Sequence, residues 1–222
     1  MKISDTIAHI QQAFENAQKG ISKCSPELLA MDGMTGKKTK HLYNNLLDMP
    51  DARYLEIGVW LGSSTCSALY KNNVTYACAV DNWSEYGGPK AQFQANLERF
   101  QITDKVKFLE ADFMKLDVSA LPKFNIYLFD GGHEYEDHVM ALFHMLDCLD
   151  DIFIFIVDDW NWRNVRGATQ FAIEQCGCKI LHGIEVRMTT DDMATDPEIA
   201  KEEFWNGVCI LLLQKSLESN VA

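Results

Sequence analysis

A chain of 222 residues, 47% of them hydrophobic, is long enough to bury the core of one ordinary domain. Its formal net charge of −12 argues against polyanionic partners, so we expect neither nucleic acid nor an anionic membrane surface. The chain has 7 cysteines with no framework spacing and no signal-peptide pattern at its start, which predicts a reducing, cytoplasmic location.

The first fifty residues are predicted to form a helical extension that precedes the sheet. Residues 4–18 have the apolar spacing of an amphipathic helix, set by Ile3, Ile7, Ile10 and Phe14. A loop with one short helical turn is expected over 22–36, and a second helix over 39–47. We expect the first helix to pack on its own domain, and an interface in a homo-oligomer is the alternative.

Short apolar runs then alternate with amphipathic segments. The predicted strands are 53–57, 74–80, 106–110, 124–130 and 151–158. The predicted helices are 63–71, 88–100, 134–149 and 163–175. This alternation predicts an α/β fold with a doubly wound, mostly parallel sheet.

The end of the chain has a different pattern. Two further strands are predicted, over 179–188 and 208–214, which brings the sheet to seven strands with a C-terminal antiparallel hairpin. The polar, acidic stretch 189–203 between them contains no strong helix pattern. We expect one domain over 1–222, in which 1–50 is a cap and 51–222 is the core.

The turn after the first strand has the strongest binding signal. Gly58 and Gly62 follow the strand and precede a helix, so backbone can come close to a ligand there. Their Gly-x-x-x-Gly spacing differs from the Gly-x-Gly-x-x-Gly of dinucleotide-binding proteins. Together with the strand carboxylate Glu56, it suits a positively charged cofactor without phosphate, such as S-adenosylmethionine.

Acidic residues follow the next two strands. Asp81 ends the second strand, where a carboxylate can bind both hydroxyl groups of a ribose. Asp112 follows the third strand, and with Phe113 it could bind and flank an adenine ring. The alternative for each aspartate is a structural role, as the cap of a helix or turn.

Three more aspartates are expected at the same edge of the sheet. Asp130 ends the fourth strand, and Asp158 and Asp159 end the fifth. Carboxylates that meet closely repel each other unless a cation neutralises them, and Mg²⁺ or Mn²⁺ prefers oxygen ligands. A metal site is therefore expected here, unless one aspartate caps a helix and another stays in solvent.

His133 lies three residues after Asp130, in the same predicted loop. Its ordinary pKa is near neutrality, so it is a candidate general base, although a lone histidine is more often structural. Several aromatic residues are expected near this edge, namely Trp60, Trp83, Tyr86, Trp160 and Trp162. Packing is the default for each, and Trp60 and Trp160 are the ones expected to touch ligands.

Taken together, the run from Glu56 to Ser64, Asp81, Asp112 and Asp130-Gly-Gly-His133 resemble the class I S-adenosylmethionine-dependent methyltransferases, whose fold is Rossmann-like. The likeness covers about residues 50–165. Within that class the chain resembles the metal-dependent O-methyltransferases, and most of all the macrolide sugar O-methyltransferases of the macrocin and mycinamicin type. Those enzymes have Asp-x-x-His after one strand and Asp-Asp after the next.

The resemblance implies Asp130, Asp158 and Asp159 as ligands of Mg²⁺ or Mn²⁺. It implies His133, beside Asp130, as the catalytic base. The residues expected to bind S-adenosylmethionine are Glu56, Gly58, Trp60, Gly62, Ser64, Asp81, Asp112, Phe113 and Asp130. The implied activity is O-methylation of a small sugar-like or natural-product-like molecule. A metal-independent methyltransferase and a non-catalytic cofactor-binding or nucleotide-binding module are the alternatives.

Overall fold

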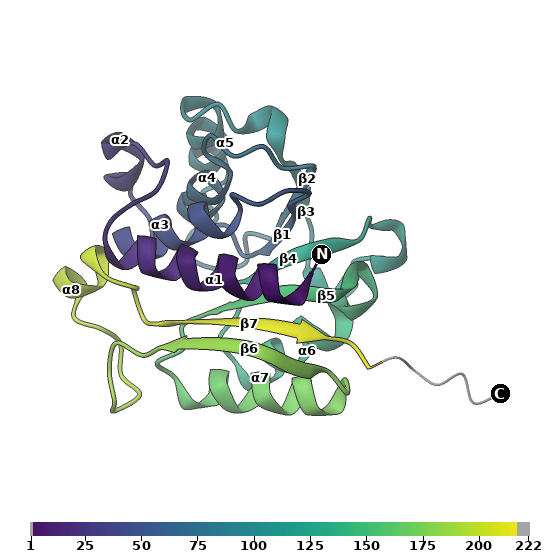
Figure 1. Cartoon of the computed structure of the whole chain (residues 1–222). Helices are drawn as coiled ribbons and strands as arrows, with labels where there is room; N and C mark the ends of the chain where they lie inside the picture. The colour runs from purple at the N-terminus through teal and green to yellow at the C-terminus, as the bar shows by residue number, and fades with distance from the viewer. Residues whose placement is uncertain (1, 217–222) are drawn as a thin grey trace.

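Seven strands form one sheet with helices on both faces in the computed structural model, which describes residues 2–216 (Figure 1). The strands are β1 (Arg53–Ile57), β2 (Tyr76–Asp81), β3 (Lys107–Glu110), β4 (Phe124–Phe129), β5 (Leu149–Asp158), β6 (Lys179–Val186) and β7 (Val208–Gln214). Their order across the sheet is β3-β2-β1-β4-β5-β7-β6. Neighbouring strands are parallel, except that β7 runs antiparallel to both β5 and β6. The predicted doubly wound sheet with an antiparallel hairpin at its end is confirmed.

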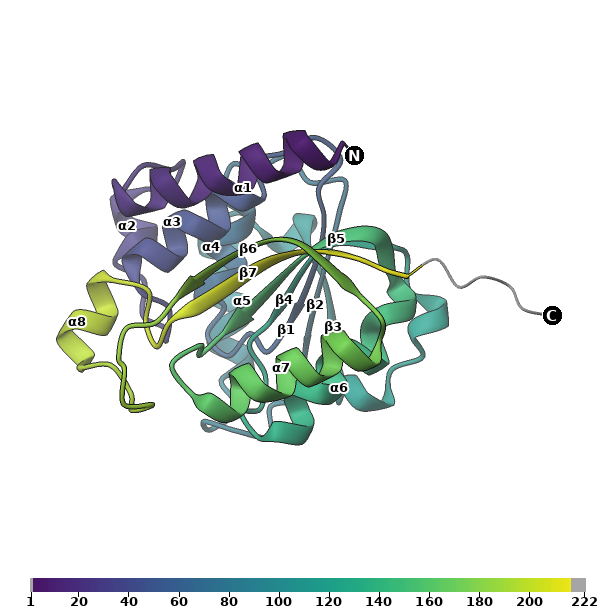
Figure 2. The same cartoon turned by 60° about the horizontal axis from the view of Figure 1, so that its bottom comes forward.

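The helices divide between the two faces of the sheet. They are α1 (Ile3–Gln18), α2 (Pro26–Leu29), α3 (Lys37–Leu46), α4 (Ser63–Leu69), α5 (Lys90–Arg99), α6 (Tyr135–Met145), α7 (Arg163–Gln175) and α8 (Pro197–Glu202). Residues of α1, α3, α4 and α5 pack on one face, whereas α6 and α7 cover the other (Figure 2). The helices predicted from the sequence are confirmed, although several end earlier than expected. Within the described residues, no helix combines the length and apolarity needed to cross a membrane.

Alternate side chains of the parallel strands enter two different hydrophobic cores. On β1, Tyr54 packs on the side of α1 and α3, whereas Leu55 and Ile57 pack on the side of α6 and α7. All three are buried, because a strand covered by helices on both faces has no polar face. Full burial of each such side chain contributes roughly 1.5–3 kcal/mol. The strand ends are therefore rigid supports for the loops that follow them.

Within the N-terminal extension, a buried lysine of α3 holds the end of α2 and the loop that follows it. Lys40 of α3 is 2% exposed, and its ammonium group donates to the carbonyl oxygens of Leu29 (3.1 Å) and Met31 (2.6 Å). Burial lowers the pKa of Lys40 to about 8, because the charged form is desolvated. The loop held in this way continues to Met34 and Thr35, at the edge of the sheet.

A short helix interrupts the acidic stretch between β6 and β7, where no strong helix was expected. Helix α8 begins after Asp196, whose Oδ1 accepts hydrogen bonds from the backbone N–H groups of Glu198 and Ile199. Pro197 occupies the first helical position, where a missing N–H has no cost. A helix of 6 residues is too short to show an apolar periodicity. The pair Asp196-Pro197, however, is a pattern typical of a helix start.

Candidate active site

A cavity of about 430 Å³ opens at the carboxyl ends of the parallel strands. Residues that end or follow β1, β2, β4 and β5 line it, namely Gly58, Asp81, Asp130, Asp158 and Asp159. Ligands of open α/β sheets bind at this edge, and pockets for small ligands measure about 300–1,000 Å³. The structure therefore brings the aspartates of separate strands together at one binding site.

The glycine turn lies directly against the end of β4. Gly58 has a φ of 84°, and a Cβ added to it would lie 1.9 Å from the carbonyl oxygen of Asp130. Gly62 has a φ of 80° at the start of α4, where an added Cβ would lie 2.8 Å from Phe93. Gly58, Trp60 and Ser64 line the cavity, whereas Gly62 is not among the lining residues. Gly62 therefore supports the turn on the side that faces away from the cavity.

Gly58→Ala is expected to lower the free energy of unfolding by about 2–5 kcal/mol, from backbone strain and overpacking together. Gly87→Ala is the matched control, since Gly87 has a φ of 79° but nothing lies within 4 Å of an added Cβ. Only the strain of about 1–2 kcal/mol applies there. Urea denaturation of both variants measures the difference. Equal losses would contradict the close approach of Gly58 to β4.

Glu56 lies beneath the cavity and is not among the residues that line it. It is 0% exposed, and its carboxylate accepts hydrogen bonds from the hydroxyl groups of Ser64 (2.5 Å) and Tyr54 (3.1 Å). Burial raises the pKa of Glu56 to about 7, although the hydrogen bond from Ser64 opposes that shift. The structure thus places this carboxylate against the start of α4. From the sequence we expected Glu56 to bind S-adenosylmethionine directly.

The raised pKa of Glu56 predicts a dependence of stability on pH. The folded state binds this proton more tightly than the unfolded state, so stability is lost as the pH rises from 4.5 towards about 7. Glu56→Gln stays neutral. Relative to this variant, the wild-type free energy of unfolding should fall by roughly 3 kcal/mol between about pH 4 and pH 8.

Denaturant titrations across this pH range measure the effect of Glu56→Gln. The exposed Glu98, changed to Gln, is the control and should follow the wild-type curve. Parallel curves for wild type and Glu56→Gln would show that the buried carboxyl group does not shift its proton affinity on folding.

Asp81 lines the cavity and organises the backbone around it. Its Oδ2 accepts hydrogen bonds from the N–H groups of Val59 (2.9 Å) and Trp60 (3.1 Å), and its Oδ1 accepts one from Trp83 (2.7 Å). A carboxylate has about four acceptor sites, so two bonds at Oδ2 and one at Oδ1 leave one further site, on Oδ1. Asp81 can therefore bind a ribose hydroxyl group and at the same time hold the turn in place.

Asp112 and Phe113 both line the cavity at the end of β3. Oδ1 of Asp112 accepts a hydrogen bond from the N–H of Met114 (3.1 Å), and its Oδ2 lies 2.9 Å from Nζ of Lys115. Lys115 holds the pKa of Asp112 below its ordinary value. The capping role considered for Asp112 is present, and the side chain still lies at the cavity.

Asp130 and Asp158 are close neighbours in the wall of the cavity. Asp158 is 3% exposed, and its Oδ1 has no hydrogen-bond partner among the described residues. Burial raises the pKa of both carboxyl groups well above its ordinary value, and the charges of neighbouring carboxylates add to the shift. A buried acceptor without a partner is costly, so this group points to a ligand.

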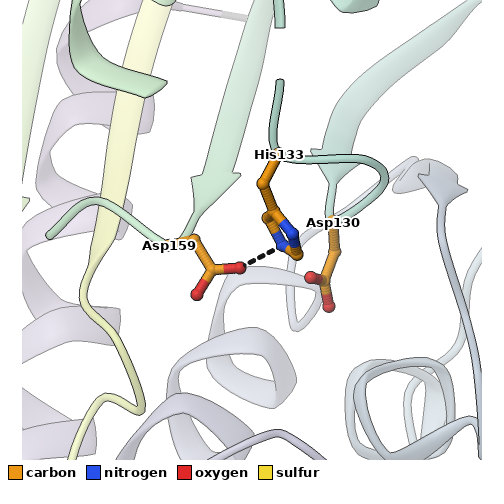
Figure 3. Close-up of side chains that lie close together, drawn as sticks. All are labelled: Asp130, His133 and Asp159. Atoms are coloured by element: carbon orange, nitrogen blue, oxygen red, sulfur yellow. Dashed lines mark ion pairs between the residues drawn. The ribbon is translucent and has the colours of Figure 1, made fainter. Parts of the chain in front are cut away.

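His133 joins this cluster through Asp159, as Figure 3 shows. Its Nε2 lies 2.5 Å from Oδ2 of Asp159, and Oδ1 of Asp159 accepts a hydrogen bond from the side chain of Asn206 (2.9 Å). Burial lowers the pKa of His133, but Asp159 and nearby acidic charges outweigh burial and raise it overall. Asp159 is thus fixed from both sides and orients the imidazole.

The cluster fits a divalent cation. One ligand atom from each of Asp130, His133 and Asp159 lies within 4.8 Å of the others. The buried Oδ1 of Asp158 is a further oxygen donor nearby. Oxygen-rich sites of this kind suit Mg²⁺ or Mn²⁺. The three residues whose ligand atoms lie this close together are Asp130, His133 and Asp159. From the sequence we expected Asp130, Asp158 and Asp159 as the ligands. The same four residues therefore offer two possible ligand sets.

Several residues at the cavity were not identified from the sequence. Trp160, expected to touch a ligand, is 5% exposed, is absent from the lining, and donates from Nε1 to Glu185. Trp162 lines the cavity instead, with its ring centroid 5.2 Å from that of His133. Lining residues outside the predicted motifs include Met34, Thr35, Glu85, Trp205 and Asn206. They come from the N-terminal extension, the loop after β2 and the segment before β7.

A scan against protein families matches residues 55–160 to a family described as a methyltransferase domain. No curated protein matches the chain by sequence. The matched region contains the glycine turn, Asp81, Asp112 and the Asp130–Asp159 cluster. The sequence similarity therefore falls on the part of the chain that builds the cavity.

Solved structures share the fold. TrmN from Thermus thermophilus has a TM-score of 0.59 at 15% identity, covering 85% of this chain, which spans only 52% of that protein. An O-methyltransferase from Bacillus cereus, in complex with SAH, has a TM-score of 0.57 at 12% identity, over 95% of this chain and 91% of that one.

PH1948 from Pyrococcus horikoshii, described as "a putative RNA methyltransferase", has a TM-score of 0.54 at 13% identity, over 93% of this chain and 97% of that one. At such low identities these likenesses establish the Rossmann-like methyltransferase fold alone. The family match over residues 55–160 agrees with this fold.

Proposed function

We propose that this protein is a metal-dependent O-methyltransferase that uses S-adenosylmethionine and acts on a small molecule with two neighbouring hydroxyl groups. The observation that carries this proposal is the pairing of His133 with Asp159 next to Asp130 and the unpartnered Asp158. A base, an orienting carboxylate and a cation-binding group then lie in one cavity. The closer resemblance to the macrocin and mycinamicin type stays a prediction.

The proposed reaction is a methyl transfer from sulfur to oxygen. A hydroxyl oxygen of the acceptor forms a bond to the methyl carbon, and the bond from that carbon to sulfur breaks. The sulfur keeps the electron pair, so the sulfonium becomes the neutral thioether of S-adenosylhomocysteine. Since Nε2 of His133 is held by Asp159, the proton of the hydroxyl group passes to Nδ1.

The cofactor assignments follow the residues at the cavity. Asp81 would bind the ribose, and Asp112 with Phe113 would bind the adenine. Gly58, Trp60, Ser64 and Asp130 would line the methionine end of the cofactor. Because Glu56 and Gly62 lie outside the lining, we assign them to supporting the turn.

Asp130, Asp158 and Asp159 would hold the metal. When bound, a divalent cation supplies positive charge that lowers the pKa of an acceptor hydroxyl group and fixes its orientation. The buried oxygen of Asp158 supports this ligand set, because it has no other partner among the described residues. His133 then stays available as the base.

A metal-independent methyltransferase is the second candidate. The hydrogen-bonded Asp159–His133 pair favours it, since a carboxylate that orients an imidazole makes a general base without further help. In that case Asp130 and Asp158 would share a proton. Dependence of turnover on magnesium distinguishes the two candidates.

A small acceptor is supported by the charge of the site. Asp81, Glu85, Asp112, Asp130 and Asp159 all line the cavity, and none of the described lining residues is lysine or arginine. Nucleic-acid affinity comes mainly from cations that contact phosphates. PH1948 keeps an RNA acceptor open as an alternative, and the acidic cavity disfavours it.

Isothermal titration calorimetry with S-adenosylhomocysteine tests the proposed function. We expect wild-type binding in the micromolar range, and about 10–100-fold weaker binding by Asp81→Ala, because hydrogen bonds to a charged group are lost. Asp104→Ala, at an exposed position outside the cavity, is the control. Absence of wild-type binding, with and without magnesium, would refute the methyltransferase assignment.

A further inference from the structure

Part of the cavity remains unused by the proposed cofactor, base and metal. The lining residues left over include Met34, Thr35, Glu85, Tyr86, Trp162 and Trp205. They belong to the N-terminal extension, the loop after β2, the loop after β5 and the segment before β7. These segments lie outside the sheet, so this wall is the one that can differ between proteins of the same fold.

The leftover wall is aromatic. The ring of Trp162 contacts that of His133, with centroids 5.2 Å apart at 61°. Tyr86 is held by Trp60, whose Nε1 donates to the Tyr86 carbonyl oxygen at 3.1 Å, and the two rings lie 6.4 Å apart. Aromatic faces attract cations as well as apolar rings.

Two carboxylates line this part of the cavity: Asp137, which already accepts a hydrogen bond from the N–H of Glu134, and the exposed Glu85. Glu85 is the one without a partner. Its side chain has no hydrogen bond or ion pair with any other described residue, unlike Asp81, Asp112 and Asp159. Glu85 and His133 line the same cavity, and the charge of Glu85 contributes to the raised pKa of His133. Two cations of the neighbouring segments are paired elsewhere, Lys38 with Glu203 and Arg166 with Asp192.

We propose that the methyl acceptor carries a basic amine in addition to its hydroxyl groups, and that Glu85 pairs with the ammonium group beside the aromatic wall. This inference rests on the proposed function, because it places the acceptor in this cavity. A free carboxylate next to aromatic faces binds an ammonium group through charge and cation–π attraction together. An anionic acceptor meets repulsion from the same surface.

Three catechols that differ in side-chain charge test the proposal: dopamine (ammonium), hydroxytyrosol (neutral) and dihydroxyphenylacetate (carboxylate). Their affinities are measured by calorimetry on the protein saturated with S-adenosylhomocysteine and magnesium. We expect dopamine to bind about fivefold more tightly than hydroxytyrosol, and dihydroxyphenylacetate to bind most weakly. Glu85→Gln should abolish the preference for dopamine, and Glu85→Lys should reverse it.

Glu136→Gln, at an exposed position on α6 outside the cavity, is the control and should keep the preference. The affinity for S-adenosylhomocysteine should be the same in wild type and in Glu85→Gln. Weaker binding of S-adenosylhomocysteine by Glu85→Gln would assign Glu85 to the cofactor and overturn the proposal. Dopamine binding that is absent, or no tighter than that of hydroxytyrosol, would also overturn it. Failure of the wild type to bind S-adenosylhomocysteine is a separate result, which would remove the proposed function and this inference with it.

Discussion

Replacing His133 with alanine is expected to lower kcat by about 10²–10⁴-fold, the usual range for loss of a general base. The imidazole lies in the cavity wall with Nε2 bound to Asp159, which leaves Nδ1 to accept the proton of the acceptor. Affinity for S-adenosylhomocysteine should change by less than about twofold, because the proposed cofactor contacts are retained. Single-turnover kinetics and calorimetry measure the two quantities.

The pH dependence of turnover should identify the same imidazole. Burial lowers the pKa of His133, but the hydrogen bond to Asp159 and the charges of Asp158 and Glu85 raise it overall above 6.5. A base must be neutral to accept a proton, so kcat should rise with pH through this raised pKa. The rise should vanish in His133→Ala.

His144→Ala is the matched control, since His144 bonds the Leu116 carbonyl oxygen and does not line the cavity. It should keep wild-type turnover. Unaltered turnover in His133→Ala would remove the base assignment.

The acidic edge of the sheet could be predicted because its signals are local. Asp81 ends one buried apolar run, and Asp158 ends another, so each position follows from the strand that precedes it. Parallel strands end at a common edge, and their aspartates therefore meet there without any knowledge of the loops. Gly58 was likewise readable, because the turn after β1 needs a positive φ.

The role of Glu56 could not be predicted in the same way. Side chains of a strand alternate between faces, and Glu56 shares a face with Tyr54. That face packs against helices, so the carboxylate enters the layer beneath the cavity and bonds Ser64. The sequence showed an acidic residue near the glycine turn, but which side of the turn it meets depends on how α4 packs.

Tyr86 and Trp162 were expected near this edge of the sheet, but the place of Trp205 in the cavity wall could not be predicted, for a different reason. Thr35 bonds Ser63, and an added Cβ at Gly36 would lie 2.0 Å from the Glu203 carbonyl oxygen, so segments far apart in the chain are in close contact. Trp205 reaches the cavity through this packing. Such contacts follow from the tertiary fold, and no periodicity or motif records them.

Chelation of divalent cations by EDTA is expected to lower turnover by at least about 100-fold, and added magnesium should restore it, because a bound cation contributes several kcal/mol of charge stabilisation. Asp158→Asn assigns the effect to this cluster. Its Oδ1 is buried without a partner, and loss of its charge should weaken magnesium binding by more than about 100-fold.

The same substitution should stabilise the metal-free protein by roughly 1–3 kcal/mol, since it removes a carboxyl group whose burial next to Asp130 and Asp159 disfavours its charged form. A gain in stability together with a loss of magnesium binding distinguishes a functional carboxylate from a structural one, whose loss would destabilise the fold. Asp151→Asn makes the same chemical change at the exposed, opposite end of β5, so both quantities should stay at wild-type values. Wild-type magnesium affinity in Asp158→Asn, or full turnover after chelation, would contradict the metal site and leave the Asp159–His133 pair as the catalytic centre.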